Sequence, residues 1–255
     1  MSCNLTEKIY KLDTLYERGI ETTDDFYTMP ILKPESFIPE KIVGFSDLKN
    51  YGPCDFGVHF FLDDHRFEQV WSHPMKYLNK MKRAQCVFSP DYSLYIGMPT
   101  AMSIWNAYRN RFLGALYQSY GLKVIPTVVW GDEDTYDFAF AGLPKNSVLA
   151  ITTLGICRYE LEKKYFRQGI AELIKRLDPS DLLVYGQKLD FDSGNAKVHW
   201  YPNEIIARLR EVTKRQKMEK EREKKEKEEK RILQKSDVNE EERRQIILER
   251  RQCCT

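Results

Sequence analysis

Short apolar runs alternate with longer stretches of helical periodicity through the middle of this chain, and successive runs lie about 30 residues apart. Strands that alternate with helices are typical of βα units on a parallel sheet, because parallel strands need a long crossover connection. The pattern therefore predicts an α/β fold with a mostly parallel sheet of about six strands. The apolar runs span 41–45, 56–62, 85–89, 123–130, 148–153 and 182–185, and the helical stretches span 66–83, 99–120 and 158–177.

The number of strands decides between an open sheet and a closed barrel. About six strands are too few for a closed βα barrel, which needs eight, so an open or incomplete barrel-like sheet is expected. A barrel would close only if the N-terminal arm and the 190–200 segment also contributed strands. Within that segment, a hairpin turn is expected at 192–195, before Lys197–Tyr201.

Two segments that flank the alternating pattern differ from it in composition. Residues 1–40 hold a short helical pattern and then three prolines, which indicates an extended arm on the α/β domain of residues 41–202. Residues 203–255 form a tail rich in Lys, Arg and Glu. Acidic-to-basic pairs four residues apart, such as Glu221 and Lys225, predict a long charged C-terminal helix without a coiled-coil partner.

The charge of the chain is unevenly distributed. The net charge is +2, and in the tail the basic residues outnumber the acidic ones by about four, so residues 1–202 are slightly acidic. Since non-specific nucleic-acid binding needs positive charge, the 214–251 segment is the predicted contact for nucleic acid or a protein partner. No apolar run reaches the ~20 residues of a membrane span, and the six cysteines lack C-x-x-C spacing, which favours a cytoplasmic protein.

Polar residues follow five of the predicted strands. The carboxyl ends of parallel strands gather at one edge of a sheet, and ligands bind there. We therefore expect a ligand site at this edge, although Asp, Ser, Thr and Gly are also common in such loops because they cap helices and form turns. The residues concerned are Asp64 after the second strand, Asp91 after the third, Asp132 and Asp134 after the fourth, Thr152, Thr153 and Gly155 after the fifth, and Tyr185 at the end of the sixth.

These residues divide into three predicted roles. Asp64, Asp91 and Asp132 are the candidate catalytic acids. Asp91, Asp132 and Asp134 are candidate ligands for Mg²⁺ or Mn²⁺, which prefer oxygen donors. The candidate ligand-binding residues are Thr152, Thr153, Gly155 and Tyr185.

Three other polar residues have structural interpretations. His59, Asp63 and His65 share one side of an extended strand and could ligate one metal, but Phe61 shares that side. A loop histidine that caps the next helix is the default interpretation. Arg111 lies on the apolar stripe of the 99–120 helix, which predicts a buried ion pair, because an unpaired buried charge is costly. Arg109 lies on the polar side and is expected in solvent.

Residues 85–155 resemble the family known as domain of unknown function 4417, and the resemblance extends more loosely to Gly186. The segments that carry it are Phe88–Ser93, Ile104–Arg111, Lys123–Asp132 and Gly142–Ser147. Members of this family occur in phages and other mobile elements of bacteria. The resemblance implies a protein that acts in replication, transfer or conflict with a host, and it supplies no activity for any residue.

The sequence leaves open whether the protein is an enzyme. It lacks the standard motifs of P-loop, dinucleotide-binding, serine-hydrolase and zinc-protease proteins. This favours an accessory module of a mobile element that binds a ligand or nucleic acid without catalysis. One alternative is a metal-dependent hydrolase of phosphoesters or nucleotides that uses the acids at the strand ends, and another is a protein that sequesters nucleotides. The substrate and the oligomeric state remain open.

Overall fold

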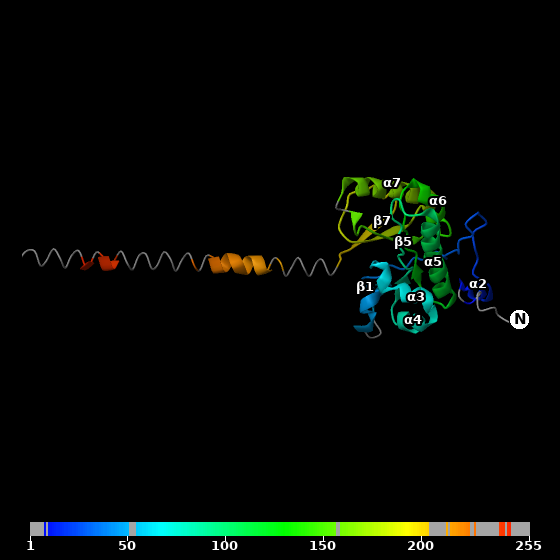
Figure 1. Cartoon of the computed structure of the whole chain (residues 1–255), viewed down its shortest axis with the longest axis horizontal. Coiled ribbons are helices and arrows are strands. Elements are labelled where there is room, and N and C mark those ends of the chain that lie inside the picture. Colours follow the sequence, from blue (N-terminus) through cyan, green and yellow to red (C-terminus); the bar gives the residue numbers. More distant parts are fainter. Residues whose placement is uncertain are drawn as a thin grey trace, which may run out of the picture. The chain divides into compact units, whose positions relative to one another are not determined.

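In a computed structural model, residues 8, 10–50, 55–156 and 159–203 are described, together with 213, 215–224, 227, 240–242, 244 and 245 (Figure 1). The chain divides into two compact units, Met1–Pro202 and Asn203–Thr255, and each is described by itself. The first unit contains all the strands of the described residues.

Seven parallel strands stand in chain order. The first sheet has the order β1-β2-β3-β4 and the second has the order β5-β6-β7. The predicted parallel α/β fold is therefore confirmed, but the predicted count of about six strands is wrong. The bounds are β1 Ile42–Gly44, β2 Gly57–His59, β3 Cys86–Phe88, β4 Val124–Ile125, β5 Val148–Thr152, β6 Asp181–Tyr185 and β7 Lys197–Tyr201.

The two sheets share one inner core. A parallel bridge between Thr127 and Ala150 places β5 next to the end of β4. At the other edges, the hydroxyl of Tyr201 in β7 donates to the carbonyl of Pro39, just before β1. One apolar cluster draws side chains from all seven strands or the residues next to them: Ile42, Phe61, Cys86, Phe88, Ile125, Val148, Ala150, Leu183, Tyr185 and Tyr201. The sheets therefore curl around this cluster, and no ladder joins β1 to β7 in the described residues.

Helices pack on the outer face of the sheets. Because side chains alternate along a strand, Val58 and Val87 point away from the inner core toward the cluster formed with α3, α4 and α5. Leu149 and Leu182 point in the same way toward α7. The bounds are α2 Leu12–Glu17, η1 Phe45–Asn50, η2 Asp64–Arg66, α3 Glu68–Ser72, α4 Pro74–Met81, α5 Thr100–Ser119, η3 Glu133–Thr135, α6 Tyr136–Phe140 and α7 Glu160–Leu177.

Two sequence-based expectations about elements need correction. The helical stretch 66–83 is broken at His73, because Pro74 has no N–H to donate and forces the preceding residue out of the helical region. The expected hairpin is also wrong, since β7 runs parallel to β6. Gly194 does form a local turn, in which its N–H donates to Asp192, but the 186–196 connection then carries the chain back to the start of the sheet.

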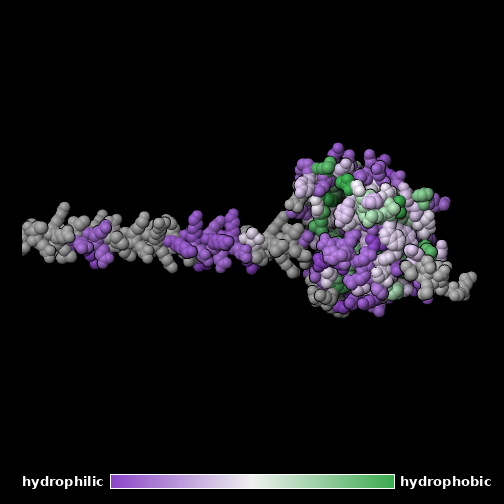
Figure 2. Space-filling view, in the orientation of Figure 1, coloured by the Kyte–Doolittle hydropathy of each residue, from purple (hydrophilic) through white to green (hydrophobic). Residues whose placement is uncertain are grey.

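The structure describes most of the predicted arm, residues 1–40, but only part of the predicted tail, residues 203–255. In the arm, Met29 and Leu32 are buried, and the N–H of Leu32 donates to the carbonyl of Gly142. In the tail, residues 215–224 are helical, exposed and hydrophilic (Figure 2). The rest of the predicted long helix lies mostly outside the described residues. Among the helices described, none has the length and apolar character needed to cross a membrane.

Candidate acid site at the carboxyl ends of β2 and β3

Two loops that follow neighbouring parallel strands are joined through Asp64. Asp64 begins η2 shortly after β2, and Ser93 lies five residues beyond the end of β3. The Ser93 hydroxyl donates to the Asp64 carboxylate at 2.8 Å, and the Ser93 N–H lies 3.2 and 3.3 Å from its two oxygens. These bonds fix the orientation of the Asp64 carboxylate at the end of the sheet where ligands bind in parallel α/β folds.

Asp91 lies close enough to Asp64 for the charge of Asp64 to raise its pKa. Its side chain is half-buried, and its Oδ1 is buried without a hydrogen-bond partner in the described residues. Burial, and then the negative charge of Asp64, raise the pKa of Asp91 to about 8. At neutral pH, Asp91 is therefore mainly a neutral acid beside the Asp64 carboxylate, which is the type of pair that occurs at functional sites.

Helix α5 holds the Ser93 loop in place through Asn106 and Arg109. The Asn106 amide donates to the carbonyl of Ser93 at 2.7 Å, and Arg109 donates to the Asn106 oxygen at 2.6 Å. Arg109 also donates to both carboxylate oxygens of Glu68, at 2.7 and 2.8 Å, and lies 3.8 Å above the ring of Tyr92. A chain of hydrogen bonds thus runs from Glu68 through α5 to Asp64.

The expectation that Arg109 lies in solvent is wrong, because Arg109 is only 8% exposed. The polar side of α5 packs against the loop after β3, so polar side chains are buried there by hydrogen bonds to that loop. The sequence correctly placed Arg109 on the polar face of this helix, but it does not show what that face contacts.

Arg111 belongs to a separate buried network on the same helix. Its Nε donates to the carbonyl of Ala141 at 3.0 Å, and its other nitrogens donate to the Asn110 side chain and to the carbonyl of Ala139. The expected ion pair is therefore wrong: these partners are an amide and the carbonyls at the end of α6, a helix terminus that attracts cations. Burial lowers the pKa of Arg111 to about 9.

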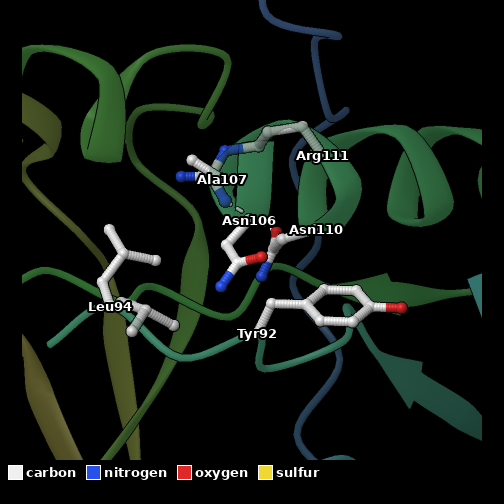
Figure 3. A pocket seen from close by; sticks show the side chains of 7 residues that line it. Tyr92, Leu94, Asn106, Ala107, Asn110 and Arg111 are labelled. Atoms are coloured by element: carbon white, nitrogen blue, oxygen red, sulfur yellow. Dashed lines mark hydrogen bonds between the residues drawn. The ribbon is translucent and has the colours of Figure 1, made fainter. Parts of the chain in front are cut away.

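The packing around this network leaves a narrow cavity (Figure 3). Asn106 and Asn110 point from α5 toward the loop that carries Tyr92 and Leu94. The cavity is too narrow to hold a water molecule.

Asp132 and Asp134 lie on the loop after β4. Asp132 is half-buried and Asp134 is exposed. The N–H and the hydroxyl of Thr135 both donate to the carbonyl of Asp132, at 3.1 and 2.7 Å. Within the described ranges, no three His, Cys, Asp or Glu side chains are grouped so that they could hold a metal ion together. The structure thus brings Asp64 and Asp91 together, and a metal site that includes Asp132 and Asp134 stays a prediction.

The predicted ligand-binding residues connect the ends of β5 and β6. The hydroxyl of Thr152 donates to the carbonyl of Tyr185 at 3.1 Å, and the hydroxyl of Thr153 donates to that of Gln187 at 2.8 Å. Gly155 has a φ of 79° in the loop that follows, a conformation that glycine adopts without strain. Their role in ligand binding stays a prediction.

His59 lies in the inner core, with its ring 4.4 Å from that of Tyr185. Burial lowers the pKa of His59 to about 3, so its imidazole is neutral. Its Nδ1 accepts the N–H of Phe61 at 3.2 Å. His59 is buried whereas Asp63 and His65 are exposed, so the structure does not bring these three side chains to one site.

The fold and the site define an α/β domain with parallel strands in chain order and an acid pair at the carboxyl ends of two neighbouring strands. The profile of the family described as "Domain of unknown function (DUF4417)" matches residues 21–202, so the chain belongs to this family. The match confirms the resemblance found in the sequence, and it also includes the second half of the predicted arm.

Two phage proteins are clearly similar to this chain. The "Gene 1 protein" of Mycobacterium phage L5 is 41% identical over 180 residues, which are 69% of this chain and 79% of the relative. The "Gene 1 protein" of Mycobacterium phage D29 is 36% identical over 207 residues, which are 80% of this chain and 77% of the relative. No solved structure shows significant similarity.

Proposed function

We propose that this phage-related domain holds a divalent cation between Asp64 and Asp91 and uses it in the hydrolysis of a phosphate ester. The observation that supports this proposal is the position of Asp91 beside Asp64, with Oδ1 buried and without a partner in the described residues. Two neighbouring carboxylates repel each other unless a proton or a cation lies between them. A cation that replaced the proton of Asp91 would satisfy both groups.

Two carboxylates fit Mg²⁺ or Mn²⁺, and they are too few for a metal ion whose ligands all come from the protein. Mg²⁺ commonly keeps several waters and is held by one or two carboxylates together with a phosphate of the substrate. When bound, such an ion supplies a nucleophilic water and charge for the phosphate oxygens. The residues of this chain supply orientation, because Ser93 fixes the Asp64 carboxylate and Asn106 fixes Ser93.

Mn²⁺ binding, followed by electron paramagnetic resonance between pH 6 and pH 9, tests the cation site. Because Asp91 must lose its proton, the affinity of wild type is expected to rise nearly tenfold per pH unit and to level off above pH 8. Asp64→Asn and Asp91→Asn should abolish binding, and Asp24→Asn, an exposed control outside every predicted site, should not. Equal binding by all four proteins would contradict the proposal.

Product analysis then separates hydrolysis from sequestration. Wild type is incubated with Mg²⁺ and a panel of nucleotides and phosphodiesters, and the products are separated by chromatography. Hydrolysis that Asp91→Asn abolishes is the expected result. Recovery of bound but intact nucleotide would instead support a nucleotide-sequestering protein with the same site.

We also propose a second role, in which the tail contacts nucleic acid. Within the described helical segment 215–224, five residues are basic and three are acidic, and all are exposed. Deleting residues 214–251 should weaken DNA binding and reduce its dependence on salt concentration, since fewer counterions are then released. Unchanged affinity and salt dependence would rule out the tail as the contact.

A further inference from the structure

We infer that Asn110 is a positioning residue of the acid pair, because its side-chain amide holds the turn that carries Asp91 against the loop after β4. Asn110 lies in the middle of α5 and is 2% exposed. This inference rests on the proposed function, since Asn110 acts on the cation site only through Asp91. It adds the loop after β4 to the elements that shape this site.

The nitrogen of the Asn110 side chain joins the loops after β3 and β4. It donates to the carbonyl of Pro90 at 2.7 Å and to the carbonyl of Thr127 at 3.2 Å. Pro90 lies two residues beyond the end of β3, and Thr127 lies two residues beyond the end of β4. These two strands are neighbours in the sheet, so one nitrogen fixes the separation of two adjacent strand ends.

The oxygen of the same side chain is also fully used. The Ser89 hydroxyl donates to it at 3.1 Å and accepts the N–H of Thr127 at 2.8 Å. Arg111 donates to the Asn110 oxygen at 2.6 Å. An asparagine side chain has two N–H donors and an oxygen that accepts two bonds, so Asn110 uses its whole hydrogen-bonding capacity. Aspartate would lack the donors at this position, and leucine would lack both the donors and the acceptor.

Asp91 is the residue that these bonds position. The Pro90 carbonyl that accepts from Asn110 also accepts the N–H of Tyr92 at 3.1 Å. Asp91 is therefore the central residue of a tight three-residue turn. Because Asn110 bonds to the first residue of this turn, it fixes the backbone next to the acid.

The same side of α5 holds the other end of this segment (Figure 3). Asn106 lies four residues before Asn110, on the same side of the helix, and donates to the Ser93 carbonyl at 2.7 Å. The segment 90–93 is thus bonded to α5 both before and after Asp91. Hydrogen bonds are directional, so they hold a side chain in a narrower range of positions than apolar packing does.

Mn²⁺ binding to the full chain, measured by electron paramagnetic resonance at pH 9, tests the inference. At this pH the proton of Asp91 no longer limits binding. Asn110→Ala is expected to weaken binding about tenfold, because groups that orient metal ligands usually contribute at least this much to affinity. Asn110→Ser keeps one donor and one acceptor, so it should recover part of this loss.

Ser147→Ala is the matched control for a simple loss of stability. Ser147 is 1% exposed and lies directly before β5, at the opposite end of the sheet from the acid pair. Its hydroxyl accepts the N–H of Glu35 at 2.9 Å and donates to the Glu35 carbonyl at 3.1 Å. Urea unfolding should show that all three variants are less stable than wild type, but Ser147→Ala should bind Mn²⁺ like wild type.

The outcomes separate this inference from the proposed function. Unchanged Mn²⁺ affinity in the folded Asn110 variants, or an equal loss of affinity in Ser147→Ala, would overturn the positioning role alone. Unfolding of both Asn110 variants without urea would show a purely structural role and would also overturn it. Failure of wild type to bind Mn²⁺ would overturn both the proposed function and this inference.

Discussion

At Asp91, a carboxyl group is kept neutral by its surroundings, and this has a cost that depends on pH. The native state holds a proton with a pKa of about 8, whereas the ordinary value is 3.8. Between these values the native state binds a proton that the unfolded state releases, so stability falls as pH rises from about 4 to about 8. The burial of Asp91 thus makes the protein less stable at pH 8 than at pH 4.

Asp91→Asn is therefore expected to stabilise the protein at pH 8, because the amide carries no charge to bury. Since each pKa unit corresponds to 1.36 kcal/mol, we expect a gain of at least about 1 kcal/mol at pH 8 relative to pH 5. Urea unfolding at both pH values measures this gain. Asp134→Asn is the control, and parallel pH profiles for Asp91→Asn and wild type would contradict the assignment.

Unlike Asp91, the buried Arg111 side chain has hydrogen-bond partners, and these offset the cost of burying its charge. Arg111→Met should lower the free energy of unfolding by about 2–4 kcal/mol, because the carbonyls of Ala139 and Ala141 lose their donor. Arg167→Met, which removes an exposed arginine, should cost less than about 0.5 kcal/mol. Denaturant titration of both variants measures the difference, and similar losses would show that the buried network contributes little.

The sequence could locate part of this site. Asp64 and Asp91 follow apolar runs, and the rule that strand ends gather at one edge brought both into the candidate site. This rule does not say which loops touch. It therefore could not show that Asp132, on the loop after β4, is not joined to Asp64 and Asp91. Arg109 was missed for a different reason: its neighbours Tyr92 and Glu68 come from distant parts of the chain.

Among the elements, helix α7 lies close to Trp130 at Gly169. A Cβ built on Gly169 would lie 1.9 Å from Nε1 of Trp130. Helix propensity alone predicts that alanine stabilises this position by about 0.5–1 kcal/mol. The contact with Trp130 predicts the reverse, because the helix or the indole must move.

Gly169→Ala is thus expected to destabilise the protein by about 1–3 kcal/mol, the usual cost of overpacking. Gln168→Ala, at an exposed position one residue earlier on the same helix, should change stability by less than about 0.5 kcal/mol. Thermal unfolding of the two variants gives the comparison. A stabilising Gly169→Ala would show that the indole moves aside freely.

The elements that the sequence predicted well are those with clear start and stop signals. Helix α5 begins after Pro99 and ends before Gly121, and α7 ends before Asp178. Strand β7 was not recognised as a parallel strand, because the turn at Gly194 looks like a hairpin when only the local sequence is considered. The tertiary pairing with β6 decides its direction, and local sequence does not encode that pairing.

For the whole molecule, the division at residue 202 carries a prediction about stability. All the strands and core clusters described here lie in the unit Met1–Pro202. Removing residues 203–255 should therefore leave the thermal midpoint of the domain within about 2 °C of the full chain. Calorimetry of both forms measures this, and a large drop in the midpoint would show that the tail stabilises the domain.

The junction between the sheets also affects how the molecule forms. Strands β1 to β4 pair entirely within residues 42–125, and β5 joins them through the Thr127–Ala150 bridge with backbone bonds on either side. Every strand thus finds its partner in a segment that the ribosome has already released, apart from β1, which waits for β2. The domain can therefore assemble progressively from its N-terminal side during translation, and a nascent chain halted near residue 170, at which β4 has left the ribosomal tunnel, should already protect the amides of β2 and β3 from hydrogen exchange.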